Sequence, residues 1–188
     1  MINKLFIFPI YIIFAFLAFN MLPKTFFQQD EWLIFGNYFF WDLSGWNWWQ
    51  RLFVYEQAER TLSTHIVPLS VIVSYLEYHF FGLNFSLYAL AAITIHFTNA
   101  ILVYWLAFVL TKKRTISFIS GLLFLVNSIS HQGFTWMATV IGTAGSTLAM
   151  LLFLIFLSKY VFEKSKLGYL ILGILFLAAS FLFKETSF

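Results

Sequence analysis

Long apolar runs separated by short polar segments dominate the chain. The first run, residues 5–22, approaches the roughly 20 apolar residues that a helix needs to cross a bilayer. Five more apolar runs follow it, at 66–81, 85–110, 116–130, 137–157 and 167–183. The pattern predicts an all-α protein, a polytopic bundle of membrane helices.

Composition points the same way. Of the 188 residues, 61% are hydrophobic and only 10% are charged, whereas soluble domains carry about 25% charged residues. The net charge of +3 resides mainly in short loops, so it does not indicate a nucleic-acid partner. Cysteine is absent, which excludes disulfides, thiolate metal sites and cysteine nucleophiles.

The distribution of charge predicts which loops share a side of the membrane. Basic loops stay in the cytoplasm, and basic residues cluster at 112–114 and within 159–166. The loop 23–65 holds five acidic against three basic residues and is expected outside. We therefore predict the cytoplasmic (inner) membrane as the location, with the amino terminus inside.

If the run 66–81 crossed the membrane, the basic segments 112–114 and 159–166 would lie outside, in conflict with this sidedness. The run is short for a span, starts near Pro68 and contains Glu77 and His79. A helix lying along the outer interface fits it better. The prediction is thus about five crossings, 5–22, 85–110, 116–130, 137–157 and 167–183, with an outer loop over 23–84.

The first part of this outer loop is dense in Trp, Phe and Tyr with charges interleaved. We expect amphipathic juxtamembrane helices that are broken near Ser44-Gly45. An aromatic belt that only anchors the protein at headgroup depth is the alternative, and the two interpretations are compatible.

The acidic pair Asp30-Glu31 follows the first span directly. A carboxylate at the mouth of a membrane helix is costly, and its default interpretation is functional. Partial desolvation beside Trp32 would raise the pKa of Asp30 towards the range of a general base. The alternative is a pair of solvated loop acids.

Basic and histidine side chains on the same predicted face are candidate phosphate ligands. Arg60, Arg51 and Lys24 lie in the outer loop, with contact to lipid headgroups as the alternative, above all for Lys24. His65 could orient a phosphate or serve the structure. Further candidates end two of the spans on this face: His131-Gln132 and Lys184-Glu185.

Two polar residues inside a span, His96 and Asn99, share one helix face at a spacing of three. We expect them to form hydrogen bonds between helices rather than to act in catalysis. Ala138, Gly142 and Ser146 recur every four residues and predict close helix packing.

Several short motifs follow one another along the chain: the Asp30-Glu31 pair after a first span, His65-x-x-Pro68, FFGLN (80–84), ITIHFTNAILVYWLAFVLTKKR (93–114), HQGFTW (131–136) and KET (184–186). Their order resembles the amino-terminal part of the GT-C superfamily of polytopic membrane glycosyltransferases. The resemblance is closest to the protein O-mannosyltransferase-like branch, which includes the TPR-bearing transmembrane O-mannosyltransferases.

This resemblance implies transfer of a sugar from a polyprenyl-phosphate-linked donor to an acceptor hydroxyl at the outer membrane face. The acceptor would be a protein, a lipid or a glycan. Asp30 would act as the general base of an inverting reaction, with Glu31 beside it. Relatives continue into further spans after the terminal motif, so we expect the chain to be the amino-terminal part of a longer module.

Other functions remain open from the sequence. A non-catalytic membrane subunit, or a protein that binds or transports a lipid carrier, would use the outer acids only to position headgroups. A transporter with His96 and Asn99 on its pathway ranks last, because only His96 is ionisable at mid-membrane. A divalent metal is possible, although no ligand spacing is diagnostic.

Overall fold

The computed structural model describes residues 4–53, 67–127, 135–162 and 167–185. All regular elements within these ranges are helices, which confirms the predicted all-α class. In chain order they are α1 (Lys4–Phe19), the 3-10 turn η1 (Leu22–Lys24), α2 (Gln29–Leu43), α3 (Trp48–Phe53), α4 (Pro68–Phe81), α5 (Phe85–Thr111), α6 (Arg114–Val126), α8 (Met137–Phe162) and α9 (Leu167–Phe183).

Three segments of the described chain are long and apolar enough to cross a membrane: Ile7–Lys24, α5 and α8. Helices α6 and α9 are apolar but shorter, with 13 and 17 residues. At 1.5 Å per residue they are about 20 and 25 Å long, against a hydrocarbon core of about 30 Å. The protein is therefore an all-α membrane protein, while the number of five crossings stays a prediction.

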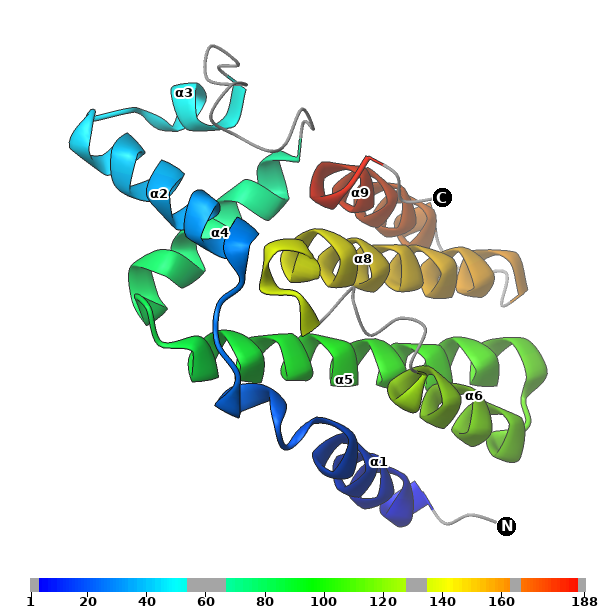
Figure 1. Cartoon of the computed structure of the whole chain (residues 1–188). Coiled ribbons are helices and arrows are strands. Elements are labelled where there is room, and N and C mark those ends of the chain that lie inside the picture. Colours follow the sequence, from blue (N-terminus) through cyan, green and yellow to red (C-terminus); the bar gives the residue numbers. More distant parts are fainter. Residues whose placement is uncertain (1–3, 54–66, 128–134, 163–166, 186–188) are drawn as a thin grey trace.

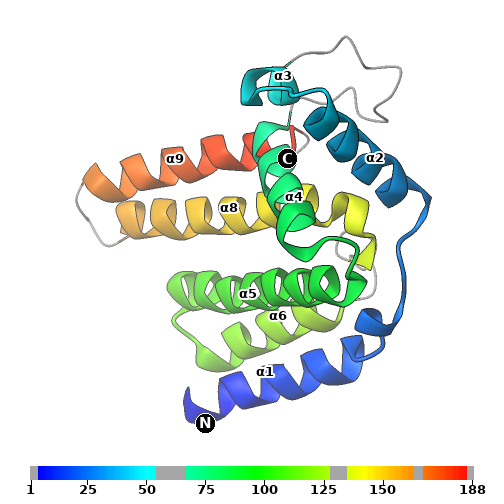
Figure 2. The ribbon, with the colours of Figure 1, turned by 90° about the vertical axis from the view of Figure 1, so that its left-hand side faces the viewer.

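The five apolar helices lie alongside one another, and consecutive ones run in opposite directions (Figure 2). Helix α5 packs against α6 on one side and α8 on the other, α9 packs against α8, and α1 packs against α6. Figure 1 shows the amino terminus and the α5–α6 turn at one end of the bundle. We call this the basic end, after Lys112, Lys113 and Arg114.

Helices α2, α3 and α4 gather at the opposite end, which we call the α4 end (Figure 2). Helix α4 does not run alongside the bundle but across it, in contact with α5, α8 and α9. Pro68 begins α4, where its missing N–H costs nothing. Helix α2 ends at Leu43, and Gly45 takes a positive φ of 64°, so the predicted break near Ser44-Gly45 is confirmed.

Several boundaries differ from the predicted ones. The first helix was expected over 5–22, but α1 ends at Phe19 and the 3-10 turn η1 follows it. The run 116–130 was expected to be helical throughout, but α6 ends at Val126 and the backbone of Asn127 is extended. The helix predicted at 137–157 continues to Phe162. Lys159 belongs to this additional part of α8, and its ammonium lies over the rings of Trp105 and Tyr169. Cation–π contacts of this kind allow a basic residue to remain within an otherwise apolar helix.

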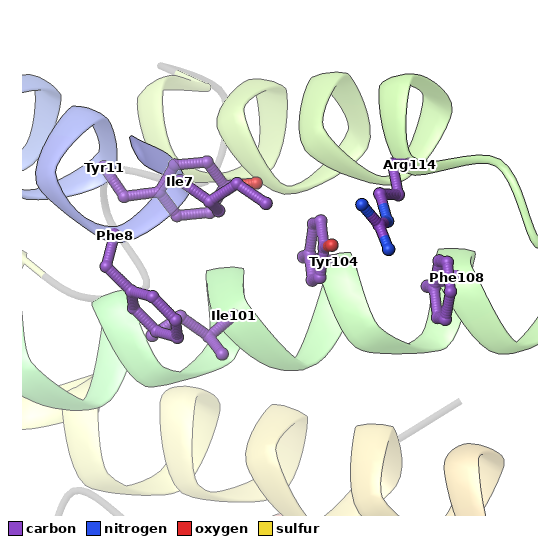
Figure 3. Close-up of a pocket in the computed structure, with 7 residues that line it drawn as sticks. All are labelled: Ile7, Phe8, Tyr11, Ile101, Tyr104, Phe108 and Arg114. Atoms are coloured by element: carbon purple, nitrogen blue, oxygen red, sulfur yellow. The ribbon is translucent and has the colours of Figure 1, made fainter. Parts of the chain in front are cut away.

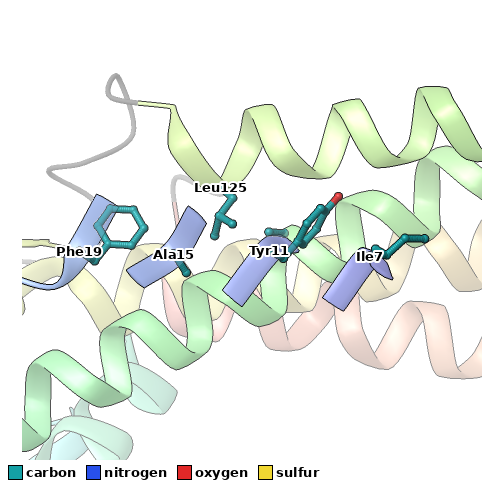
Figure 4. Packing of buried hydrophobic residues seen from close by; sticks show 6 residues of the cluster. Ile7, Tyr11, Ala15, Phe19 and Leu125 are labelled. Carbon is teal, nitrogen blue, oxygen red and sulfur yellow. The ribbon is translucent and has the colours of Figure 1, made fainter. Parts of the chain in front are cut away.

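Helix α1 is held by one apolar stripe. Ile7, Tyr11, Ala15 and Phe19 recur every fourth residue, so they share a face, and Figure 4 shows them beside Leu125 of α6. The Tyr11 hydroxyl donates a hydrogen bond to the Phe118 carbonyl at 2.9 Å. The hydroxyl, which is the only polar group of this fully buried side chain, therefore has a hydrogen-bond partner.

The polar residues of α5 connect the bundle internally, as predicted. The His96 ring nitrogen Nε2 lies 3.0 Å from the Leu125 carbonyl of α6. The Asn99 amide donates to the Ala144 carbonyl of α8 at the same distance. The prediction that these two residues form hydrogen bonds between helices is confirmed.

Candidate functional site

Glu31 joins two distant parts of the chain at the α4 end. Its side chain is only 3% exposed. One carboxylate oxygen accepts a hydrogen bond from the Gln28 amide, just before α2, and the other accepts from the Ala138 amide at 3.1 Å, in the first turn of α8. Carboxylates are favoured at helix amino termini, where amide groups lack partners. Glu31 therefore caps two helices at once and fixes α2 against α8.

Asp30 occupies the first turn of α2, next to this anchor, and is half-buried. Its carboxylate forms no hydrogen bond or ion pair with any residue that the structure describes. Of the two neighbouring acids, Glu31 is thus engaged in structure, and Asp30 presents the available carboxylate. A general base needs this combination of a fixed position and a carboxylate that is available to accept a proton.

Lys184 reaches the same helix that Glu31 caps. Its ammonium donates a hydrogen bond to the Thr143 hydroxyl of α8 at 3.1 Å. Thr143 lies five residues beyond Ala138, or about 7.5 Å along the helix axis. The structure therefore brings the Lys184 ammonium and the Asp30-Glu31 pair to the first turns of α8. Glu185 follows at the end of α9 and is half-buried.

Three candidate phosphate ligands, Arg60, His65 and His131, lie outside the described residues. Their roles stay predictions. Lys24 is exposed at the end of η1.

Arg51 is occupied within the α4 end. Its guanidinium pairs with Asp42 at 3.1 Å and donates to the Trp46 carbonyl at 2.8 Å. It also lies over the rings of Trp48 and Tyr75. The Asp42 carboxylate accepts a hydrogen bond from the Tyr75 hydroxyl as well, which raises the pKa of Tyr75. Arg51 thus joins α2, α3 and α4. The sequence suggested Arg51 as a phosphate ligand or a contact to lipid headgroups, and this structural role was not predicted.

Glu77 of α4 was not among the candidates from the sequence, where it served only as an argument against a crossing helix. Burial raises the pKa of its carboxyl from 4.5 to about 7. The phenol groups of Tyr38 and Tyr88 belong to the buried aromatic cluster near it. It forms no hydrogen bond or ion pair within the described part of the chain. An acid in the middle of a helix rich in aromatic residues was the available sequence signal.

Within the described ranges, no three His, Asp or Glu side chains converge as metal ligands would. Glu31 is engaged by backbone amide groups, Asp42 by Arg51 and Tyr75, and Glu77 lies in an aromatic environment. The described part of the α4 end therefore offers carboxyl groups and a lysine for chemistry.

Comparison of the chain with models of protein families, with curated proteins and with solved structures gives no match.

Proposed function

We propose that the protein transfers a sugar from a polyprenyl-phosphate-linked donor to an acceptor hydroxyl, with Asp30 as the general base. The observation that carries the proposal is the contrast within the acidic pair. Glu31 holds α2 rigidly on α8, and this leaves the adjacent Asp30 carboxylate at a defined place without a partner among the described residues. Such support by a neighbouring residue is what a positioned base requires.

In this reaction Asp30 removes the proton from the acceptor hydroxyl. The resulting oxygen nucleophile attacks the anomeric carbon of the sugar, and the bond from that carbon to the lipid phosphate breaks with inversion. The phosphate leaves with the electron pair, and a cation near it stabilises the charge that develops. Lys184 is the candidate for that cation, because it lies at the same end of α8.

The arrangement of the helices supports a substrate attached to lipid. Exposed aromatic side chains surround the α4 end, among them Phe26, Trp32, Trp49 and Phe80. Aromatic rings of this kind settle at headgroup depth. A donor whose phosphate lies at the membrane surface would therefore meet Asp30 and Lys184 at a matching depth.

The test compares Asp30→Asn with Asp42→Asn, which makes the same chemical change about 18 Å further along α2. Membranes that contain each variant receive radiolabelled polyprenyl-phosphate mannose, and the release of polyprenyl phosphate is measured. We expect Asp30→Asn to lower the rate at least 100-fold, the usual contribution of a general base. Asp42→Asn should retain most of the activity.

Two outcomes would reject Asp30 as the base: equal activity of Asp30→Asn and the unmodified chain, or equal loss in both variants. Glu31→Gln adds a further check on the division of roles. It should lower thermal stability, because a carboxylate that caps two helices is lost, and Asp30→Asn should not.

The alternative function is a non-catalytic subunit that binds a lipid carrier, and the exposed aromatic rings of the α4 end favour it equally. The same membranes distinguish the two. A subunit of this kind would retain the labelled donor without releasing polyprenyl phosphate, and retention would not depend on the Asp30 carboxylate.

A further inference from the structure

A cavity of about 250 Å³ lies near the basic end of the bundle, between α1, α5 and α6. Its walls are almost entirely apolar or aromatic (Figure 3). Helix α1 contributes Ile7, Phe8 and Tyr11, and helix α5 contributes Ile101, Tyr104 and Phe108. Helix α2, which carries Asp30, lies at the opposite end of the bundle (Figure 2).

One charged side chain lines this cavity. Arg114, the first residue of α6, extends towards α5 beside Tyr104 and Phe108 (Figure 3). It is half-buried, and it forms no hydrogen bond or ion pair with any of the described residues. A guanidinium next to an apolar cavity and without a counter-charge is costly, so it predicts an anionic partner.

The surroundings of Arg114 reinforce this positive site. Lys112 and Lys113 precede it in the α5–α6 turn and are exposed. Helix α6 begins here without a side chain that caps its first amide groups. Free amide groups at a helix amino terminus bind phosphate oxygens, and arginine binds phosphate in a bidentate manner.

We propose that this cavity binds an anionic phospholipid of the surrounding bilayer, with its phosphate on Arg114 and one acyl segment between α1 and α5. The charge is complementary, and the walls suit a hydrocarbon chain. The volume lies below the roughly 300–1,000 Å³ of sites that enclose whole small molecules. It therefore accommodates part of an acyl chain, while the remainder of the lipid stays in the bilayer.

The position of α1 makes the cavity accessible from the lipid. The outer face of this helix carries exposed Phe8, Ile12 and Phe16. A neighbouring lipid can thus insert one chain beside Phe8 while its headgroup remains at the depth of the α5–α6 turn. Clusters of basic residues at that depth attract anionic lipids.

The experiment measures lipids retained by the purified full-length chain in nonionic detergent, by native mass spectrometry. Phosphatidylglycerol is compared with phosphatidylcholine of the same acyl chains, with and without excess inorganic phosphate. The unmodified chain should prefer phosphatidylglycerol, and inorganic phosphate should not displace it. Arg114→Gln should weaken this binding about tenfold, as expected for the loss of charge-assisted hydrogen bonds.

Two further variants separate the site from general charge attraction. Lys113→Gln removes the same charge from an exposed neighbour that does not line the cavity, and it should change binding less than twofold. Ile101→Trp fills the cavity and leaves Arg114 in place, and it should weaken binding as strongly as Arg114→Gln. Equal effects of Arg114→Gln and Lys113→Gln, or no effect of Ile101→Trp, would overturn the proposal.

A labelling experiment on the unmodified chain does not depend on the folding of any variant. Phosphatidylglycerol with a photoactivatable group in its acyl chain should label residues 7–11 and 101–108. Labelling confined to the exposed faces of α8 and α9 would contradict the site. Displacement of the lipid by free phosphate would show that Arg114 binds soluble anions instead, and would overturn the proposal. Retention of a second copy of the chain in place of lipid would show that the cavity belongs to an interface between two chains, and would overturn it as well.

Discussion

At the scale of single residues, two acids of the α4 end are stabilised in different ways. Glu31 is buried, and two backbone amides donate hydrogen bonds to its carboxylate oxygens. Glu77 has an aromatic environment instead, and burial raises the pKa of its carboxyl to about 7. Two glutamates at one end of the bundle thus have different surroundings, with amide donors at Glu31 and aromatic rings near Glu77.

The stability of the protein should depend on pH through Glu77. Because its pKa in the folded chain lies above its ordinary value, the folded state holds this proton more tightly than the unfolded state. Stability should therefore fall as the pH rises from about 4.5 to about 7 and then level off. The change attributable to Glu77 is at most roughly 3–4 kcal/mol, since its pKa rises from 4.5 to about 7 and one pKa unit corresponds to about 1.4 kcal/mol.

The variant Glu77→Gln isolates this effect. Thermal unfolding in detergent, followed by tryptophan fluorescence between pH 5 and 8, should show a smaller decline in Tm for the variant than for the unmodified chain. Parallel curves for the two proteins would show that Glu77 titrates in the fold as it does in water.

At the scale of helices, small residues determine how closely the elements approach. Gly142 of the predicted packing motif does lie against a neighbour, since an added Cβ would stand 3.4 Å from the Phe183 carbonyl and 3.5 Å from the Ser70 hydroxyl. Among the described glycines, Gly121 of α6 lies closest to atoms of neighbouring helices, and it is not part of the predicted four-residue packing motif. A Cβ there would stand 2.7 Å from the Ala100 carbonyl oxygen and closer still to the Tyr11 hydroxyl.

Gly121→Ala should separate α1, α5 and α6. Because one of the obstructing atoms belongs to the α5 backbone, a side chain cannot simply turn away, and we expect a loss of roughly 1–3 kcal/mol. Gly168→Ala is the matched control in α9, where nothing lies within 4 Å of the added atom. It should be neutral or slightly stabilising, since alanine favours helices. Equal Tm values for the two variants would contradict the close contact.

At the scale of the whole molecule, the helices separate two chemically different ends. Consecutive bundle helices alternate in direction, so the basic turn 112–114 and the end of α8 lie at the same end of the bundle (Figure 2). The acids of α2 and Lys184, which follows α9, lie at the other end, near α4. One end carries mainly positive charge, and the other carries mixed charge and aromatic rings.

Labelling of single cysteines tests this two-sided arrangement, since the chain has none of its own. The exposed residues Ser44, Lys113 and Val161 are each replaced by cysteine and treated with a membrane-impermeant thiol reagent. In intact cells Ser44→Cys should react, whereas the other two should react only after permeabilisation, because basic ends face the cytoplasm. Reaction of Lys113→Cys together with Ser44→Cys in intact cells would contradict the predicted topology.

Local patterns in the sequence determined much of this architecture. Apolar runs predicted the bundle helices, with α9 found at the predicted residues and α5 within one residue. Ser44-Gly45 predicted the end of α2, and the partnering of His96 and Asn99 followed from their cost in an apolar setting. These features depend on the composition of a short segment and on the spacing of its apolar residues, both of which can be read from residues close together in the sequence.

Contacts between distant residues were decided only by the tertiary structure. Glu31 caps a helix that begins more than a hundred residues later, and the pKa of Glu77 is raised because α4 lies among aromatic rings from other helices. The same holds for the approach at Gly121 and for the cavity beside Arg114. Each depends on how helices cross and on which faces meet, and many packings of the same helices would satisfy the same apolar pattern.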